Sequence, residues 1–432
     1  MNLLNNKYIS FFHNNEKKHK GIAIAIFFIK WIVLGTIVGI ATGVACTFFL
    51  KSLDLASYER TNHPWLLFLL PLGGIFISYL YINFGKNSSK GNNLILDCVH
   101  SGDDSIPLRM APLVSFCTFI THLLGGSAGR EGVGVQIGGS LSEWIGKVFK
   151  VNEIDRKILL VCGISSGFGS IFGTPLTGTI FGLEVLAIGS MKYDSLIPCF
   201  TASFVGSLVT SELGIHHNHT ALHNVPTLSP IVILKVILAS ILFGLASILF
   251  AEMTHKFKKL FSKHLKNPML KSFVGGLVII ILVYTVGSRE YLGLSLPLIT
   301  NSFEKAASPY TFLLKTIFTS LTLSFGFQGG EVTPLFVIGS TLGSALSPLL
   351  NLPIAFLAAM GYISVFCGAT NTPIACFILS IELFGSEAMP YMLMACIVSY
   401  LFSGHSTIYT SQKVAVRKYS YRRHESTGDT ES

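Results

Sequence analysis

Arg130 and Glu131 form a charged pair between Gly129 and Gly132, within the otherwise mostly small or apolar stretch HLLGGSAGREGVGVQIGGS. Charged side chains between two apolar segments are costly to bury, so they usually have a function. A carboxylate in a low-dielectric environment binds a proton more readily than a carboxylate in water. Glu131 is therefore the first candidate for a residue that gains and loses protons.

Two glycine-flanked loops are candidate anion sites, because each of them precedes a predicted helix. The first N–H groups of a helix have no partner within the helix, and the helix dipole places partial positive charge beside them. The sequence predicts helix N-termini just after residues 129–132 and just after residues 330–333. Glycine lets an ion approach the backbone, and Pro334 suits a first helical turn. The candidate anion-binding residues of the two loops are Gly129, Arg130, Gly132, Val332 and Thr333.

Glu131 would be an anion tethered to an anion site, and this suggests a mechanism. The ionised side chain occupies the place that a free anion would take, and the protonated side chain can move away. Proton movement is thereby coupled to anion movement. The alternative is a purely structural ion pair with Arg130. Because neighbouring side chains rarely face each other, and because intramembrane carboxylates usually have a function, we favour the coupling role.

The helices that position these residues are predicted to lie in a membrane. Of the 432 residues, 50% are hydrophobic and only 12% are charged, whereas a soluble domain has roughly 25% charged residues. A helix needs about 20 apolar residues to span a bilayer, and the long apolar runs are 21–50, 63–84, 231–252 and the shorter 272–287. The runs are continuous and show no strand alternation, so we predict an all-α polytopic membrane protein. The first run is too long for a cleaved signal peptide and is expected to be retained.

Basic residues gather in three regions, at residues 17–20, 256–271 and 417–423. The positive-inside rule predicts that all three regions are cytoplasmic. These cytoplasmic regions explain the net charge of +9. The charge therefore does not indicate nucleic-acid binding, and we do not expect nucleic acid as a partner. The predicted organisation is a cytoplasmic N-terminal tail (1–20), a transmembrane domain (21–409) and a cytoplasmic C-terminal tail (410–432).

The transmembrane domain contains an internal repeat. GREGVGVQIGGS, from residue 129, matches GGEVTPLFVIGS, from residue 329, and GTPLTGTIFGLEV, from residue 173, matches NTPIACFILSIEL, from residue 371. Short segments interrupted by Gly or Pro at matching positions of two halves are typical of a transporter's central site. We predict repeat halves at about 21–213 and 228–409.

These motifs, together with the later GHSTIY, resemble in order the signatures of the CLC family of anion channels and proton-coupled antiporters, over about residues 91–409. The resemblance implies the CLC-type fold, in which two inverted-topology repeats are built from broken helices. It also implies a homodimer in which each subunit has its own pore. It further implies that Glu131 is the gating and proton-coupling glutamate, and that Tyr409 is the inner tyrosine that binds the anion.

Three departures from the chloride-transporting members resemble the fluoride-exporting bacterial branch. Asn92, in KGNNLI, stands where chloride proteins usually have the serine of GSGIP. Val133 replaces the proline of GREGP. In the loop at residues 330–333, this chain has Thr333 within EVTP. The resemblance implies a fluoride/proton antiporter of the bacterial plasma (inner) membrane with both termini cytoplasmic. The alternative is a chloride channel or chloride/proton exchanger of the same family.

The chemistry of the candidate residues is consistent with fluoride. Fluoride holds its water tightly, so a selective site must offer several hydrogen-bond donors in place of that water. Asn92 offers an amide NH₂ group, and Thr333 and Tyr409 offer hydroxyl groups. A proton gradient is the obvious source of energy for export.

Three features leave alternatives open. Many proton-coupled chloride members have a second glutamate where this chain has Val185, so the inner proton route is undefined. Glu331 could be a second proton carrier or a structural acceptor, whereas Glu184 and Glu382 are expected to be structural. The spacing within HHNHTALH, His216 to His223, would allow a metal site, but we favour a solvated loop on the outer side.

No catalytic or cofactor pattern is apparent. The eight cysteines are scattered and form no CxxC pair, so they are read as buried hydrophobic residues. The chain has no HExxH sequence. We therefore expect no resident metal, no cofactor and no enzymatic activity, and the expected partners are fluoride, protons and the lipid bilayer.

Overall fold

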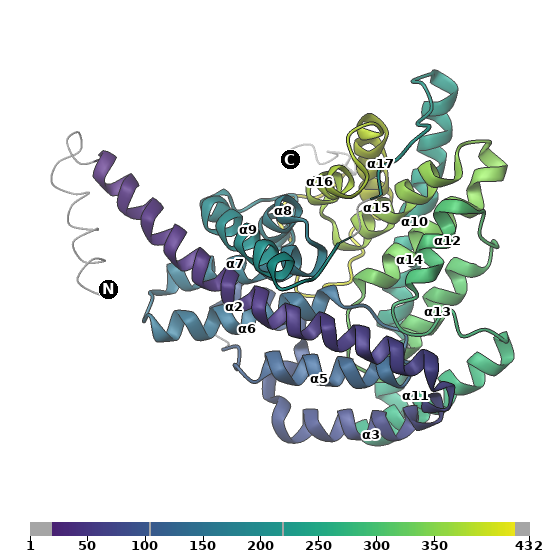
Figure 1. Cartoon of the computed structure of the whole chain (residues 1–432), viewed down its shortest axis with the longest axis horizontal. Coiled ribbons are helices and arrows are strands. Elements are labelled where there is room, and N and C mark those ends of the chain that lie inside the picture. The colour runs from purple at the N-terminus through teal and green to yellow at the C-terminus, as the bar shows by residue number, and fades with distance from the viewer. Residues whose placement is uncertain (1–19, 103–104, 218–219, 420–432) are drawn as a thin grey trace, which may run out of the picture.

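The computed structural model describes residues 20–102, 105–217 and 220–419, which are almost entirely helical (Figure 1). The parts of the predicted tails before residue 20 and after residue 419 lie outside the described residues. The helices of the first half are α2 (Lys20–Asn62), η1 (Pro64–Leu69), α3 (Leu70–Leu80), η2 (Tyr81–Gly85), η3 (Lys86–Lys90), α4 (Asn92–His100), α5 (Met110–Leu123), α6 (Glu131–Val148), α7 (Glu153–Phe172), α8 (Pro175–Glu184), η4 (Tyr193–Ser195) and α9 (Leu196–Glu212).

The second half repeats this succession of helices after a connecting loop. Its helices are α10 (Pro230–His264), α11 (Pro268–Val286), α12 (Leu296–Glu304), α13 (Thr311–Ser324), α14 (Val332–Leu350), α15 (Ile354–Thr370), α16 (Pro373–Phe384) and α17 (Met389–Phe402). Two very short strands, β1 (Ala187–Ile188) and β2 (Lys413–Val414), pair in parallel and join the C-terminal segment to the end of α8.

The apolar helices differ in how much of their surface is buried by the rest of the protein. Within the part of the chain that the structure describes, five helical segments are long and apolar enough to cross a membrane. In α10 only 39% of the most apolar window is buried, whereas in α14 the share is 78%. The exposed apolar side chains of the less buried helices, such as Phe48 and Ile231, are suited to contact with lipid. The chain therefore surrounds the broken helices with protein and keeps their free backbone groups away from hydrocarbon.

The internal repeat is visible in the packing of equivalent helices. A Cβ atom on Gly138 of α6 would lie 2.0 Å from the carbonyl oxygen of Gly163 on α7. Gly339 of α14 would place a Cβ atom 2.0 Å from the carbonyl oxygen of Gly361 on α15. Because α6 begins at Glu131 and α14 at Val332, Gly138 and Gly339 are at equal distances from their helix starts, one residue away from the register of the sequence match. In both halves, the two helices touch backbone to backbone at a glycine of the broken helix. The predicted all-α fold of two inverted repeats is confirmed.

Two glutamates join the halves reciprocally. The carboxylate of Glu184, at the end of α8, accepts the N–H groups of Ile374 and Ala375 at the start of α16. The carboxylate of Glu382, near the end of α16, accepts the N–H groups of Leu176 and Thr177 at the start of α8. Each carboxylate satisfies orphan donors and lies at the positive end of a helix dipole. The structural role expected for both residues is confirmed.

Candidate functional site

The two glycine-flanked loops meet at the centre of the molecule. The N–H of Gly129 donates to the carbonyl of Gly330 over 2.6 Å, and the N–H of Gly330 donates to the carbonyl of Gly129 over 2.7 Å. This bridge brings the first turns of α6 and α14 together. The helices begin at Glu131 and Val332, inside the two loops. The predicted starts after residues 132 and 333 were thus up to two residues late, because helix ends are poorly marked in sequence.

The carboxylate of Glu131 lies at the N-terminus of α14. The Thr333 hydroxyl lies 2.6 and 2.7 Å from its two oxygens, and the Thr333 N–H donates over 2.9 Å. The N–H of Arg130 donates to the same carboxylate over 3.2 Å. The Glu131 residue is only 1% exposed. A protein carboxylate therefore occupies the place that an anion would take at this helix end.

Arg130 also contacts Glu131 through its side chain. Its Nε atom lies 3.7 Å from one carboxylate oxygen, and the guanidinium side chain is 21% exposed against 1% for Glu131. The premise that these neighbouring side chains point apart is wrong, because Arg130 precedes the helix and is not bound by helical geometry. The contact with Thr333 is about 1 Å shorter and has a defined donor, so Thr333 is the principal partner of the carboxylate.

Two cavities approach the bridge, and they share no lining residue. The outer vestibule, of about 690 Å³, is lined by Glu131, Thr333, Arg130, Tyr362 and His216, among others. The inner vestibule, of about 450 Å³, is lined by Asn92, Tyr409, Glu331, Lys258 and Lys271, among others. The names follow the positive-inside rule, because the two lysines belong to the basic region predicted to be cytoplasmic. The paired loops therefore lie between two separate cavities.

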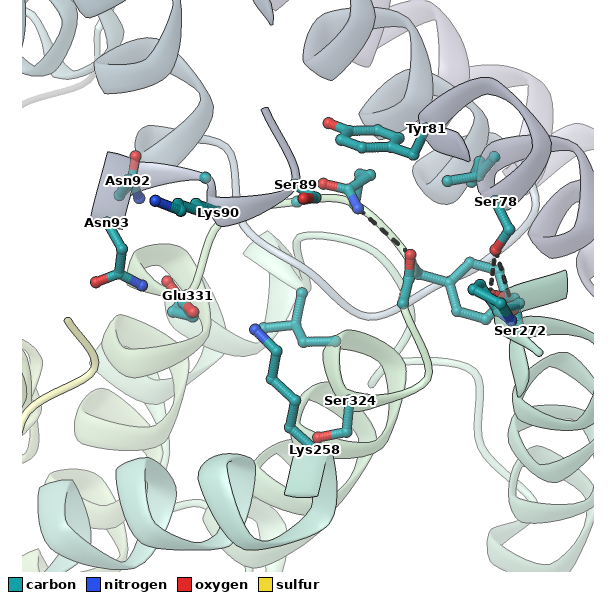
Figure 2. Close-up of a pocket in the computed structure, with 18 of the residues that line it drawn as sticks. Ser78, Tyr81, Ser89, Lys90, Asn92, Asn93, Lys258, Ser272, Ser324 and Glu331 are labelled. Atoms are coloured by element: carbon teal, nitrogen blue, oxygen red, sulfur yellow. Dashed lines mark hydrogen bonds between the residues drawn. The ribbon is translucent and has the colours of Figure 1, made fainter. Parts of the chain in front are cut away.

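The inner vestibule is rich in hydrogen-bonding groups (Figure 2). Figure 2 shows Lys258 reaching into the cavity from α10, and the cavity is also lined by Glu331, Asn92 and Asn93. Asn92 is the first residue of α4, and its side-chain oxygen is buried with no hydrogen-bond partner among the described residues. Tyr409 is 4% exposed. The unpartnered atom of Asn92 is thus an acceptor, and a ligand arriving from this side would meet the whole Asn92 amide beside Tyr409.

The predicted site residues lie at the bridge between the two loops or on the walls of the two vestibules. Gly129, Arg130, Gly132, Val332 and Thr333 lie at the two converging N-termini. Asn92 touches the first turn of α6, since a Cβ atom on Gly132 would lie 2.8 Å from the Asn92 side-chain nitrogen. Tyr409 lines the inner vestibule together with Asn92 and Glu331.

Two further polar residues line the vestibules and were missed in the sequence. Gln136, one turn after Gly132, lines the inner vestibule and donates to the carbonyl of Gly132 over 3.3 Å. Tyr362 lines the outer vestibule and stacks on Phe336 with ring centroids 3.9 Å apart. Gln136 could have been noticed as an amide within an apolar run. Tyr362 has no local signal, because only the packing of α15 on α14 brings it near Glu131.

Val185 offers no inner proton acceptor. Its side chain is 2% exposed, and its carbonyl accepts the Gln412 amide over 2.9 Å. A void of about 10 Å³ is lined by Val185, Asn92 and Tyr409, together with apolar residues. That volume is close to the smallest space that holds one water molecule. Any inner proton route at this point would depend on water or on movement of Glu131 itself.

Known proteins resemble this chain over most of its length. Residues 73–404 match the family model for voltage gated chloride channels. The chain is 44% identical over 396 residues to a chloride/fluoride channel protein of Pseudomonas syringae pv. tomato, and the match covers 90% of this chain and 88% of the relative.

Two solved structures have a similar fold. The crystal structure of a CLC-type fluoride/proton antiporter matches with a TM-score of 0.87 and 37% identity, over 90% of this chain and 98% of that chain. A slow cyanobacterial Cl⁻/H⁺ antiporter matches with a TM-score of 0.77 and 19% identity, over 88% of this chain and 96% of that chain. At this lower identity the likeness concerns the fold alone.

Proposed function

Because the chain belongs to the voltage-gated chloride channel family, the CLC family, we propose that it is a fluoride/proton antiporter that exports fluoride from the cytoplasm. Its relatives include a protein named for chloride and fluoride and a solved fluoride/proton antiporter. The observation that carries the proposal is the Glu131 carboxylate, held by the backbone and the hydroxyl of Thr333 at a helix N-terminus. A titratable acid there competes directly with an anion.

The geometry suggests how the exchange proceeds. A proton from the outer vestibule neutralises Glu131 and weakens its attraction to the N-terminus of α14. Fluoride from the inner vestibule then takes the place beside Thr333 and leaves toward the outer vestibule. When Glu131 loses its proton to the inner side, its carboxylate returns to Thr333. Each cycle moves fluoride outward and protons inward.

Selectivity for fluoride is proposed to depend on the donors along this path. A small anion that gives up its water needs short, strong hydrogen bonds in return. Asn92 and Tyr409 would supply an amide and a hydroxyl on the inner side, and Thr333 a hydroxyl and an N–H at the centre. The backbone at Gly129, Gly132 and Val332 would line the anion's place at the helix N-termini, and Arg130 would contribute positive charge. No metal or cofactor enters this proposal.

The chain is a multi-pass membrane protein, and three finer statements belong to the proposal. The positive-inside rule supports cytoplasmic termini. The bacterial relative and the family resemblance support the inner membrane of a bacterium and a homodimer. Chloride is the second candidate substrate, because the Pseudomonas syringae relative is named for both ions.

Ion efflux from vesicles tests the proposed function. We expect purified protein in vesicles loaded with fluoride and chloride to release fluoride much faster than chloride, while the external pH rises as protons enter. Two ion-selective electrodes and a pH electrode record the three fluxes together. Chloride release as fast as fluoride release would refute the selectivity, and fluoride release without proton uptake would refute the exchange.

Asn92→Ser is expected to weaken the preference for fluoride over chloride. The shorter serine side chain removes an amide donor, and a hydrogen bond to a charged group contributes about 1.5–3 kcal/mol. The ratio of fluoride to chloride efflux should therefore fall by roughly tenfold or more. Asn87→Ser, at an exposed asparagine of η3, is the matched control. An unchanged ratio in Asn92→Ser would exclude Asn92 from selectivity.

A further inference from the structure

We propose that His216 and His217 form a proton-collecting group at the outer vestibule, which supplies protons from outside to Glu131. The proposal rests on the proposed function and adds the residues that feed its proton-binding site. Both histidines belong to the histidine-rich loop that the sequence left without a role. Both line the same cavity as Glu131.

The loop that carries the two histidines is fixed on both sides. Before them, the N–H of Ile215 donates to the carbonyl of Thr210 over 3.0 Å. After them, the N–H groups of Thr220 and Leu222 donate to the carbonyls of Leu383 and Phe384, over 3.0 and 3.1 Å. These last bonds tie the first half of the chain to the end of α16. The described residues of the loop, 215–217 and 220–222, are thereby held at the wall of the vestibule.

The two imidazoles occupy different depths. His217 is half-buried and packs on the end of α7, since a Cβ atom on Gly173 would lie 2.3 Å from its ring. His216 is exposed. One ring therefore meets bulk solvent and the next lies within the cavity wall. His223, farther along the loop, is exposed and does not line the cavity.

The charged and titratable groups around the vestibule favour proton entry. Asp54 of α2 and Glu304 of α12 are exposed carboxylates on its wall. Arg130 and Tyr362 are the other charged or titratable side chains that line the vestibule beside Glu131. Anionic groups at a cavity mouth raise the local concentration of cations, including protons. Histidine is the side chain that ordinarily exchanges protons between pH 5 and 8.

Proton supply is slow enough to matter at neutral pH. At pH 7.5 the proton concentration is about 3 × 10⁻⁸ M, so capture at the diffusion limit of about 10⁹–10¹⁰ M⁻¹s⁻¹ gives roughly 30–300 protons per second. Turnover numbers of about 1–10³ s⁻¹ are typical. A single recessed carboxylate would wait for its proton whenever turnover is faster than this capture rate. Two imidazoles at the mouth offer more targets and hold a proton ready.

The proton balance of the step is simple. An external hydronium ion or buffer acid protonates an imidazole nitrogen. The resulting imidazolium transfers its proton to the Glu131 carboxylate through water in the 690 Å³ cavity. The histidine returns to its neutral form and Glu131 becomes neutral. No bond other than N–H and O–H changes.

The test uses the double variant H216N/H217N in fluoride-loaded vesicles whose interior is strongly buffered. With weak external buffer at pH 7.5, we expect fluoride efflux to fall about threefold to tenfold relative to the original protein. At external pH 5.5, where protons are abundant, efflux should equal that of the original protein. Added imidazole should restore the rate at pH 7.5. The matched control His223→Asn should behave as the original protein under all conditions.

The other outcomes have distinct meanings. If the double variant is slowed equally at pH 5.5 and 7.5, or imidazole does not restore it, the histidines act on structure and the inference is overturned. An unaffected double variant overturns it as well. If the original protein itself moves no protons with fluoride, the proposed function fails and not only the role of the histidines.

Discussion

Glu131→Gln is expected to abolish proton-driven fluoride transport, so that proton flux falls to the level of empty vesicles. Glutamine cannot gain or lose a proton, and without its charge it no longer competes with an anion at the N-terminus of α14. The glutamine amide also has only one acceptor oxygen for the N–H and the hydroxyl of Thr333, which both donate to the carboxylate. Uncoupled fluoride leakage is the activity that should remain.

The measurement is fluoride movement against its gradient in vesicles with a proton gradient imposed across the membrane. Glu212→Gln, at an exposed glutamate that ends α9, is the control and should transport as the original protein does. If Glu131→Gln still accumulates fluoride when a pH difference is applied, another group carries the proton. Glu331, on the inner side of the same bridge, would then be the next residue to replace.

The broken helices can be predicted from the sequence because particular residue types mark where they begin. Proline begins α8 and α16, and glycines precede α6 and α14. These signals are local, so they can be recognised without knowledge of the fold. The convergence of Glu131 with Thr333 is different, because it depends on pairing between distant loops. The internal repeat and the family resemblance supplied that information, and the bridge between Gly129 and Gly330 provides its physical basis.

The walls of the two vestibules could not be predicted in the same way. Tyr362 faces Glu131 only because its ring is stacked on Phe336. His217 enters the outer vestibule because the loop after it is bonded to the end of α16. In the sequence, Lys258 is one of many charges in a region predicted to be cytoplasmic. In the structure it belongs to α10 and lines the inner vestibule. Side-chain direction at these positions is set by tertiary packing, which leaves no periodic trace in the sequence.

Lys315 is a buried charged residue that can be recognised in the sequence, although it is not among the predicted site residues. It is the charged residue in the middle of the otherwise uncharged α13, TFLLKTIFTSLTLS, and it is 0% exposed. Its ammonium group donates to the hydroxyls of Ser127 and Ser295, over 2.9 and 2.8 Å. The carbonyls of Tyr291 and Gly293 lie 3.2 and 2.9 Å from it, so its three N–H bonds are shared among four acceptors. One cation thus joins the loop before α12 to the loop that leads to Glu131.

Lys315→Met is expected to lower the free energy of unfolding by about 3–5 kcal/mol, because it leaves several buried acceptors without a donor. The midpoint of thermal unfolding in detergent should fall by roughly 5–10 °C, as followed by tryptophan fluorescence. Fluoride transport should fall too, because Ser127 lies three residues before Arg130 in the loop that places Glu131. Lys259→Met, at an exposed lysine of α10, removes the same charge and should leave both quantities unchanged. If Lys315→Met unfolds at the same temperature as the original protein, the four acceptors find other partners and Lys315 does not hold these loops together.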